Sequence, residues 1–131
     1  MRRVADATGD SAIFEYIDGT LVVHHGKQYS VMTNDPPYDQ QLALNGYWQE
    51  VGGSIMLPGT ERPADRFVRA SYYLGEAPQT SDEREQIASV FSIIRNVSAP
   101  IGAVHAGQPN VAATLWRIVA CLLYTSDAAA E

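Results

Sequence analysis

The sequence predicts an α+β fold in which an antiparallel sheet is packed by helices. Two observations support this class: two β-rich runs separated by an Asp-Gly pair come early in the chain, and three segments with helical apolar spacing follow them. The composition is that of a globular protein, with 131 residues of which 46% are hydrophobic and 18% charged. A chain of this length buries about two-thirds of its extended surface, which is enough for one domain or one large piece of a domain.

The first predicted element is a β-hairpin. Residues 11–17 and 20–25 form its strands, and Asp18-Gly19 forms its turn, because glycine tolerates the positive φ that a tight hairpin turn demands. Successive side chains of a strand point to opposite faces, and both faces of the first strand are largely apolar. We therefore expect a sheet covered on both sides. A third strand is expected at residues 28–33.

Three helices are expected after the strands, at residues 38–50, 63–74 and 82–96. Pro36 and Pro37 suit the entry to the first helix, and its apolar residues fall at i, i+3, i+4 and i+7. Those residues are Leu44, Tyr47, Trp48 and Val51. The third helix carries a similar stripe, and Ser81 or Asp82 is placed to cap its start.

The remaining segments are expected to be a loop or short strand at 54–59 and a strand at 111–119. The last eleven residues, 121–131, do not fit what precedes them and resemble a translated adapter sequence. We therefore expect the central-to-C-terminal part of a larger domain over residues 1–120, a non-native tail over 121–131, and an open reading frame truncated at both ends.

Charge and cysteine content exclude several classes of function. The 15 acidic and 9 basic residues give a net charge of −6, which argues against nucleic acid or an anionic membrane as the main partner. No apolar run approaches the ~18 residues that a transmembrane helix requires. The single cysteine, Cys121, excludes an internal disulfide and any multi-cysteine metal site.

No metal ion or other cofactor is expected. His24 and His25 are adjacent on a predicted strand, so their rings point to opposite faces and cannot hold one ion together. His105 has no Cys or carboxylate at ligand spacing. Residues 6–10 resemble half a calcium loop but lack its alternating acidic positions, and they are expected to form a turn that enters the first long strand.

Two places could carry chemistry. Asn34 puts an amide at the end of a predicted strand, where substrate-facing groups are common, and Arg66 and Arg69 lie three residues apart near a helix start. Each has a plain structural alternative: asparagine forms turns by bonding its own backbone, and arginines on helices are commonly solvated or paired with acids. Composition and spacing alone favour these alternatives.

Five segments, taken together, resemble the choloylglycine hydrolase family, which includes conjugated bile salt hydrolases and penicillin V acylases. They occur in the family's order, at residues 6–15, 31–36, 38–42, 56–59 and 66–70. The resemblance covers residues 5 to 120. The wording Tyr-Asp-Gln-Gln-Leu-Ala-Leu-Asn, from residue 38, is most similar to the Gram-negative branch, so a periplasmic or secreted location is expected.

The resemblance implies a partial αββα fold of the N-terminal-nucleophile hydrolases, which cleave linear amides through a cysteine exposed by processing. Asn34 matches the family's oxyanion-binding asparagine and Arg66 its active-site arginine. Groups that act on one reacting centre must converge, so their side-chain heads should lie within about 10 Å of each other. Tyr38 and Leu57 are expected to line the same pocket. The implied substrate is a small acyl amide such as a conjugated bile acid, penicillin V or an acyl-homoserine lactone.

The sequence also departs from the family pattern. The N-terminal cysteine, and the arginine and aspartate that follow it, have no counterpart and are expected before Met1, so the chain alone should be inactive. Residues 46–53 lack the long insertion that some relatives use in tetramer assembly, so a homo-oligomer stays an open expectation. The alternative functions are a non-catalytic β-rich binding module and an acid-ceramidase-like amidase.

Overall fold

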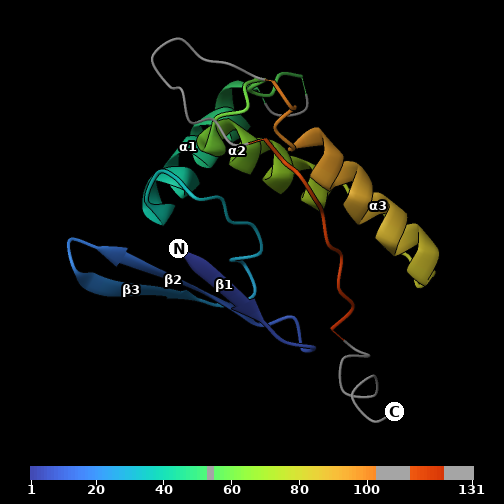
Figure 1. Ribbon diagram of the computed structural model, residues 1–131, viewed down its shortest axis with the longest axis horizontal. Helices are drawn as coiled ribbons and strands as arrows, with labels where there is room; N and C mark the ends of the chain where they lie inside the picture. Colours follow the sequence, from blue (N-terminus) through green and yellow to red (C-terminus); the bar gives the residue numbers. More distant parts are fainter. Residues whose placement is uncertain (53–54, 103–112, 123–131) are drawn as a thin grey trace.

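A computed structural model describes residues 1–52, 55–102 and 113–122. A three-stranded sheet lies on one side of the molecule and the helices lie on the other (Figure 1). The described elements are β1 (Arg2–Ala5), β2 (Ser11–Ile17), β3 (Thr20–His25), α1 (Tyr38–Val51), α2 (Pro63–Gly75) and α3 (Glu83–Asn96). The predicted α+β class, with an antiparallel sheet packed by helices, is confirmed.

The predicted hairpin is confirmed with the expected bounds. β2 and β3 pair antiparallel with Ile17 opposite Thr20, and β1 pairs antiparallel with the other edge of β2. Asp18 and Gly19 have φ values of 50° and 80°. Positive φ at both central residues is the turn geometry that matches the twist of a two-residue hairpin.

The predicted strand at 28–33 is wrong, because this segment leaves the sheet after β3. The Tyr29 N–H donates to the Gly26 carbonyl in a turn, and the Tyr29 carbonyl accepts hydrogen bonds from the side chains of Arg3 and Ser11. The apolar residues of the segment pack under the helices instead of pairing with β3. Tyr29, Val31 and Met32 pack against a core of Ile13, Tyr38 and Phe67. The third strand of the sheet is β1, which precedes the hairpin.

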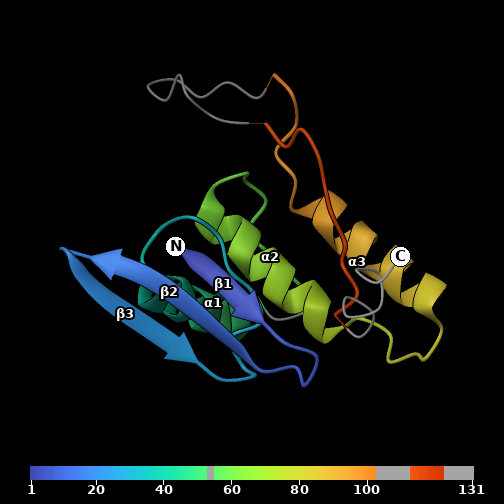
Figure 2. The ribbon, with the colours of Figure 1, turned by 60° about the horizontal axis from the view of Figure 1, so that its bottom comes forward.

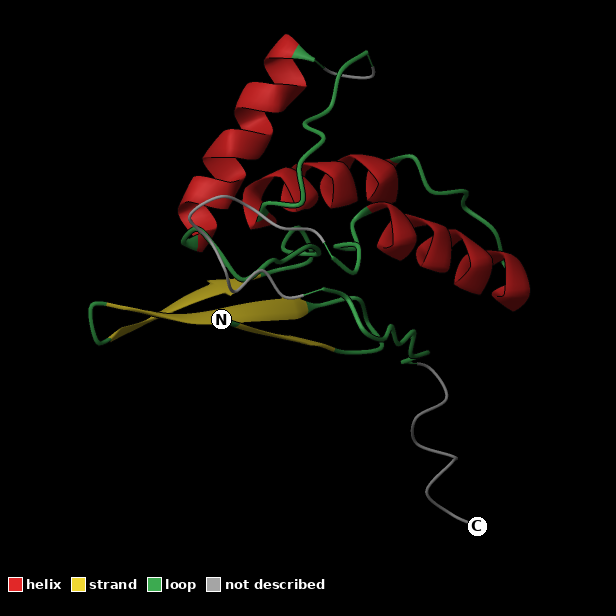
Figure 3. Cartoon of the chain, turned by 45° about the horizontal axis from the view of Figure 1, so that its top comes forward, coloured by secondary structure: helices red, strands yellow, loops and turns green. Residues whose placement is uncertain are grey.

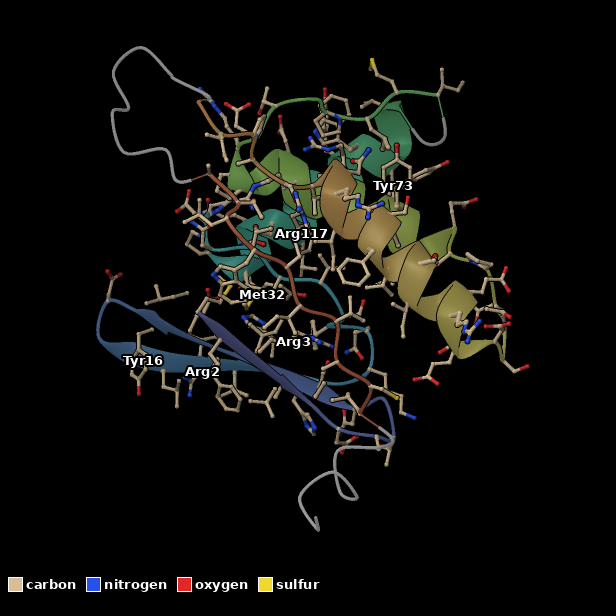
Figure 4. All side chains as sticks on the ribbon, turned by 45° about the vertical axis from the view of Figure 1, so that its right-hand side comes forward. Arg2, Arg3, Tyr16, Met32, Tyr73 and Arg117 are labelled. Atoms are coloured by element: carbon tan, nitrogen blue, oxygen red, sulfur yellow. The ribbon has the colours of Figure 1, made fainter. Side chains whose placement is uncertain are left out.

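The sheet is covered on one face only within the described residues. Figure 4 shows Arg3 and Met32 on the side of the helices, whereas Arg2 and Tyr16 lie on the opposite face. Tyr16 is 75% exposed. The expectation that the sheet is covered on both sides is therefore wrong for this part of the chain, although apolar side chains do occupy both faces.

The predicted helix at 38–50 is confirmed, but its predicted apolar stripe is not the buried face. Tyr38 and Gln41 are the buried residues of α1, whereas Tyr47 is 57% exposed. Only the first turn of α1 lies next to the sheet, and the rest of the helix extends away from it (Figure 3). The spacing of apolar residues identified the helix but not the side that it buries.

The predicted helices at 63–74 and 82–96 are also confirmed. α2 packs between α1 and α3 (Figure 2) and buries Phe67, Val68 and Arg69. Asp82 caps α3, because its Oδ1 accepts the backbone N–H groups of Arg84 at 2.8 Å and Glu85 at 3.2 Å. This geometry decides between the two caps that the sequence allowed. None of the described helices is long and apolar enough to cross a membrane.

The predicted strand at 111–119 is wrong where it is described. Residues 113–119 form no strand, and they contact the region after α3 through Ala99, whose carbonyl accepts the Thr114 N–H at 3.0 Å. Residues 55–59 form a loop, as expected. His105, the first two residues of that strand and residues 123–131 of the predicted tail lie outside the described residues.

Candidate active site

Asn34 and Arg66 meet, although 32 residues separate them in the sequence. Arg66 lies in the first turn of α2, and its Nη2 donates to the Asn34 Oδ1 at 3.2 Å. Asn34 lies in the loop that leads into α1. The expected convergence of the two side-chain heads is therefore present. Their catalytic roles stay predictions.

The contact with Arg66 fixes the orientation of the Asn34 amide. A guanidinium group only donates hydrogen bonds, so the amide oxygen must face it and the amide nitrogen must face away. No acceptor within the described residues takes a hydrogen bond from the Asn34 nitrogen. The exposed Asn34 lines a cavity of about 310 Å³. The cavity is also lined by Met1, Glu15, Tyr16, Ile17, Asp18, Asp35 and Pro37.

Arg66 is half-buried and held in place by a second contact. Its Nε donates to the Glu61 carbonyl at 2.9 Å. Burial lowers the pKa of Arg66 from its ordinary value, and the charge of Arg69 lowers this pKa further. Arginine titrates so far above neutrality that the side chain keeps its positive charge. The site therefore combines a permanent cation with an amide donor.

Arg69 points away from this pair, as expected from its place one turn further along α2. Its Nη1 donates to the carbonyls of Pro58 at 2.7 Å and Thr60 at 2.8 Å. Its Nε donates to the Asn96 Oδ1 at 3.2 Å. These partners are carbonyl groups rather than acids. Arg69 thus ties the loop before α2 to the end of α3.

Tyr38 and Leu57 do not line the cavity of Asn34. Tyr38 is buried, its hydroxyl donates to the Val31 carbonyl at 3.1 Å, and burial raises the pKa of Tyr38 to about 12, with a further contribution from Tyr29. Leu57 lies in a different cavity of about 330 Å³ between α1 and α2. The described residues thus separate these two side chains from Asn34, and their substrate-binding roles stay predictions.

Two buried polar side chains near Asn34 were missed by sequence patterns. Glu15 of β2 accepts the Tyr38 N–H with both carboxylate oxygens, at 3.1 and 3.2 Å, and lies 3.1 Å from the His24 Nε2. Gln41 of α1 is fully buried and contacts the loop that carries Asn34. The only signal for Glu15 was an acidic residue within an apolar strand, and no signal marked Gln41.

The two adjacent histidines have separate partners on opposite faces of the sheet. His24 lies on the helix side beside Glu15, and the exposed His25 lies 2.8 Å from Asp10. The described residues contain no group of three or more His, Cys, Asp or Glu side chains that could hold a metal ion. The turn expected at 6–10 is present, with the Asp6 Oδ1 accepting the N–H groups of Thr8 and Asp10.

Comparison with known proteins identifies the class that this fold and site define, the linear amide C–N hydrolases. A model of one family in that class matches residues 2–126. The chain therefore belongs to the choloylglycine hydrolase family. The resemblance seen in the five segments is confirmed.

The relatives include proteins with two named activities. The chain is 50% identical to a penicillin V acylase of Pectobacterium atrosepticum over 128 residues, covering 88% of this chain and 34% of the relative. It is 29% identical to a conjugated bile acid hydrolase of Lactobacillus gasseri over 117 residues, covering 66% of this chain and 37% of the relative. The chain thus spans about a third of the length of these relatives.

A solved structure supports the fold directly. The chain superposes on the penicillin V acylase from Agrobacterium tumefaciens with a TM-score of 0.77 and 60% sequence identity. The match covers 83% of this chain and 34% of the acylase. The helices and the antiparallel sheet therefore correspond to one part of an acylase fold.

Proposed function

We propose that the whole protein hydrolyses the linear C–N bond of a small acyl amide of the penicillin V type. Identity of 50% and 60% to two penicillin V acylases, against 29% to a conjugated bile acid hydrolase, supports this substrate class. The observation that carries the proposal is the Asn34 amide, whose oxygen is held by Arg66 and whose nitrogen is left to a ligand at the rim of a cavity.

In the proposed reaction a cysteine thiolate of the whole protein attacks the amide carbonyl. A sulfur–carbon bond forms, and the electron pair of the C=O bond moves to the oxygen. The Asn34 N–H donates to this oxyanion, a contribution of about 3 kcal/mol for one well-placed donor. Arg66 keeps the donor oriented and adds a positive charge nearby. When the intermediate collapses, the C=O bond re-forms and the C–N bond breaks, and the amine leaves with the proton that the cysteine thiol gave up. Water then cleaves the sulfur–carbon bond of the thioester, which releases the carboxylic acid and restores the thiol.

The 131-residue chain alone is expected to hydrolyse neither penicillin V nor glycocholate. Its single cysteine, Cys121, is exposed, and no contact between Cys121 and Asn34 is present among the described residues. Loss of a covalent nucleophile removes more rate than the remaining oxyanion donor supplies. A sensitive amine-release assay tests this expectation. Turnover that persists in the variant Cys121→Ala would contradict it.

A chimera tests the proposal itself. This chain replaces the matching third of the Agrobacterium tumefaciens acylase, and the remainder of that enzyme completes the protein. We expect penicillin V hydrolysis, and a loss of about 10²-fold in kcat/KM in the variant Arg66→Ala. Arg62→Ala is the matched control, because Arg62 is exposed and lies one turn earlier. Glycocholate and an acyl-homoserine lactone complete the substrate panel.

Two outcomes would contradict the proposal. A folded chimera that hydrolyses none of the three amides would contradict the proposed amide hydrolysis. If Arg66→Ala and Arg62→Ala both leave the activity of the chimera unchanged, the catalytic role of Arg66 and the assigned site are wrong.

A further inference from the structure

Gln41 contacts the loop residues on both sides of Asn34. Its Oε1 accepts the Thr33 N–H at 3.2 Å and lies 2.9 Å from the Thr33 hydroxyl. Its Nε2 donates to the carbonyls of Pro36 at 2.6 Å and Thr33 at 3.3 Å. The nitrogen and the oxygen of this buried amide therefore both contact the segment that contains Asn34, and the nitrogen also lies 3.9 Å from the Met1 Sδ.

The same loop is connected to the start of α2. The Thr33 hydroxyl lies 3.1 Å from the carbonyl of Pro63, the first residue of that helix. Arg66 is in the same first turn of α2, so this contact ties the backbone that carries Asn34 to the backbone that carries Arg66. The backbone on both sides of Asn34 is thus held by contacts that the exposed Asn34 side chain does not itself make.

We propose that Gln41 is a positioning residue that sets the Asn34 amide where it can donate to the oxyanion, an inference that rests on the proposed function. The role requires glutamine, because one group must both donate and accept. A glutamate would keep the acceptor and leave the Pro36 and Thr33 carbonyls without their donor. A methionine would keep the volume and lose all of these hydrogen bonds.

The chimera provides the kinetic test. We expect Gln41→Met and Gln41→Glu to lower kcat per titrated active site by about 10- to 100-fold with KM nearly unchanged, because small misplacements of a catalytic group are that costly. Gln40 supplies the control variants Gln40→Met and Gln40→Glu, since it is the neighbouring glutamine of α1 but is exposed and makes none of these side-chain contacts. These two controls should leave kcat unchanged.

A double-mutant cycle separates positioning from general stability. If Gln41 acts through Asn34, then Gln41→Met should have almost no further effect on kcat in an Asn34→Ala background. A merely structural role predicts a lower melting temperature and independent, additive losses of kcat in the two backgrounds. Additive losses, or an unchanged kcat in the single Gln41 variants, would overturn the proposal.

A spectroscopic measurement keeps this inference separate from the proposed function. If the unmutated chimera is inactive, the proposed function fails, and the position of Asn34 is read from the side-chain amide signals of the ¹⁵N-labelled 131-residue chain. We expect Gln41→Met to shift the Asn34 side-chain signals and Gln40→Met to leave them in place. If neither substitution shifts the Asn34 side-chain signals, the positioning role of Gln41 is wrong.

Discussion

Replacing Asn34 by aspartate tests the roles of its amide oxygen and its amide nitrogen separately. The variant Asn34→Asp keeps an oxygen toward Arg66 at the position of the present 3.2 Å contact, and it exchanges the donor nitrogen for a second oxygen. The contact with Arg66 therefore gains charge, whereas the donation to a ligand is lost. The structure predicts opposite effects on stability and on activity.

The two magnitudes follow from the surroundings of Asn34. Asn34 is exposed, so its new ion pair with Arg66 is screened and should add about 0.5–1 kcal/mol to the free energy of unfolding. Loss of one oxyanion donor costs about 3 kcal/mol, or roughly 10²-fold in kcat. A carboxylate oxygen in place of the donor also repels the developing oxyanion, which moves the loss toward about 10³-fold.

The assay is saturating penicillin V hydrolysis by the chimera, together with its denaturant unfolding curve. Gln40→Glu is the charge control, since it adds the same negative charge at a nearby exposed position. We expect the Asn34→Asp variant to be at least as stable as the parent and to retain less than about 1% of its kcat. Retention of more than about a third of kcat by a stable Asn34→Asp variant would refute the donor role.

Two further predictions concern the stability of the 131-residue chain. Asp82→Ala should lower the free energy of unfolding in urea by about 1 kcal/mol, because the Arg84 N–H loses its cap, while Ser81→Ala should change it by less than about 0.3 kcal/mol; equal effects would contradict the assigned cap. The pKa of Tyr38 is raised from 10.0 to about 12, so the folded state holds the hydroxyl proton more tightly than the unfolded state does. The stability that this proton contributes is complete below pH 10. The free energy of unfolding should then fall by about 1.4 kcal/mol per pH unit as the pH rises toward 12. Tyr38→Phe should remove that part of the decline, and an unchanged slope would count against the burial of its hydroxyl.

Local signals in the sequence were sufficient for the elements that they directly encode. Asp18-Gly19 set the hairpin turn, Pro63 the start of α2 and Asp82 the cap of α3. The errors involve strands, because a strand needs a partner that the sequence does not name. Residues 28–33 have a strand-like composition, but their apolar residues pack against the core instead of pairing with β3, whereas Arg2–Ala5 carries no strand pattern and pairs with β2.

The site was predictable only through the family resemblance. Composition and spacing favoured ordinary surface roles for Asn34 and Arg66, and nothing in their 32-residue separation predicts a hydrogen bond between them. The placement of Tyr38 and Leu57 in one pocket also came from the resemblance, and the described residues place them in different cavities. Residue order along a motif does not specify which side chains face the same space.

The chemistry of the loop before α1 explains why polar side chains are buried beneath it. Pro36 and Pro37 have no backbone N–H, so neither can donate a hydrogen bond to a carbonyl group of the loop. A buried backbone group without a partner costs about 1–3 kcal/mol, and an apolar residue in place of Gln41 would leave the half-buried backbone groups of Thr33 and Pro36 without this partner. Gln41 supplies these partners within the loop, and Glu15 supplies an acceptor for the Tyr38 N–H at the positive end of α1.

The same contacts that satisfy the backbone groups of Thr33 and Pro36 also fix the backbone on either side of Asn34. A residue whose side chain must hold one orientation toward an oxyanion benefits from a loop that cannot rearrange. Here Gln41 binds the loop backbone through the Pro36 carbonyl, and Arg66 binds the Asn34 side chain. The two prolines therefore create a need for partners that a glutamine meets, and the glutamine in turn gives the exposed Asn34 amide the fixed position that the proposed reaction requires.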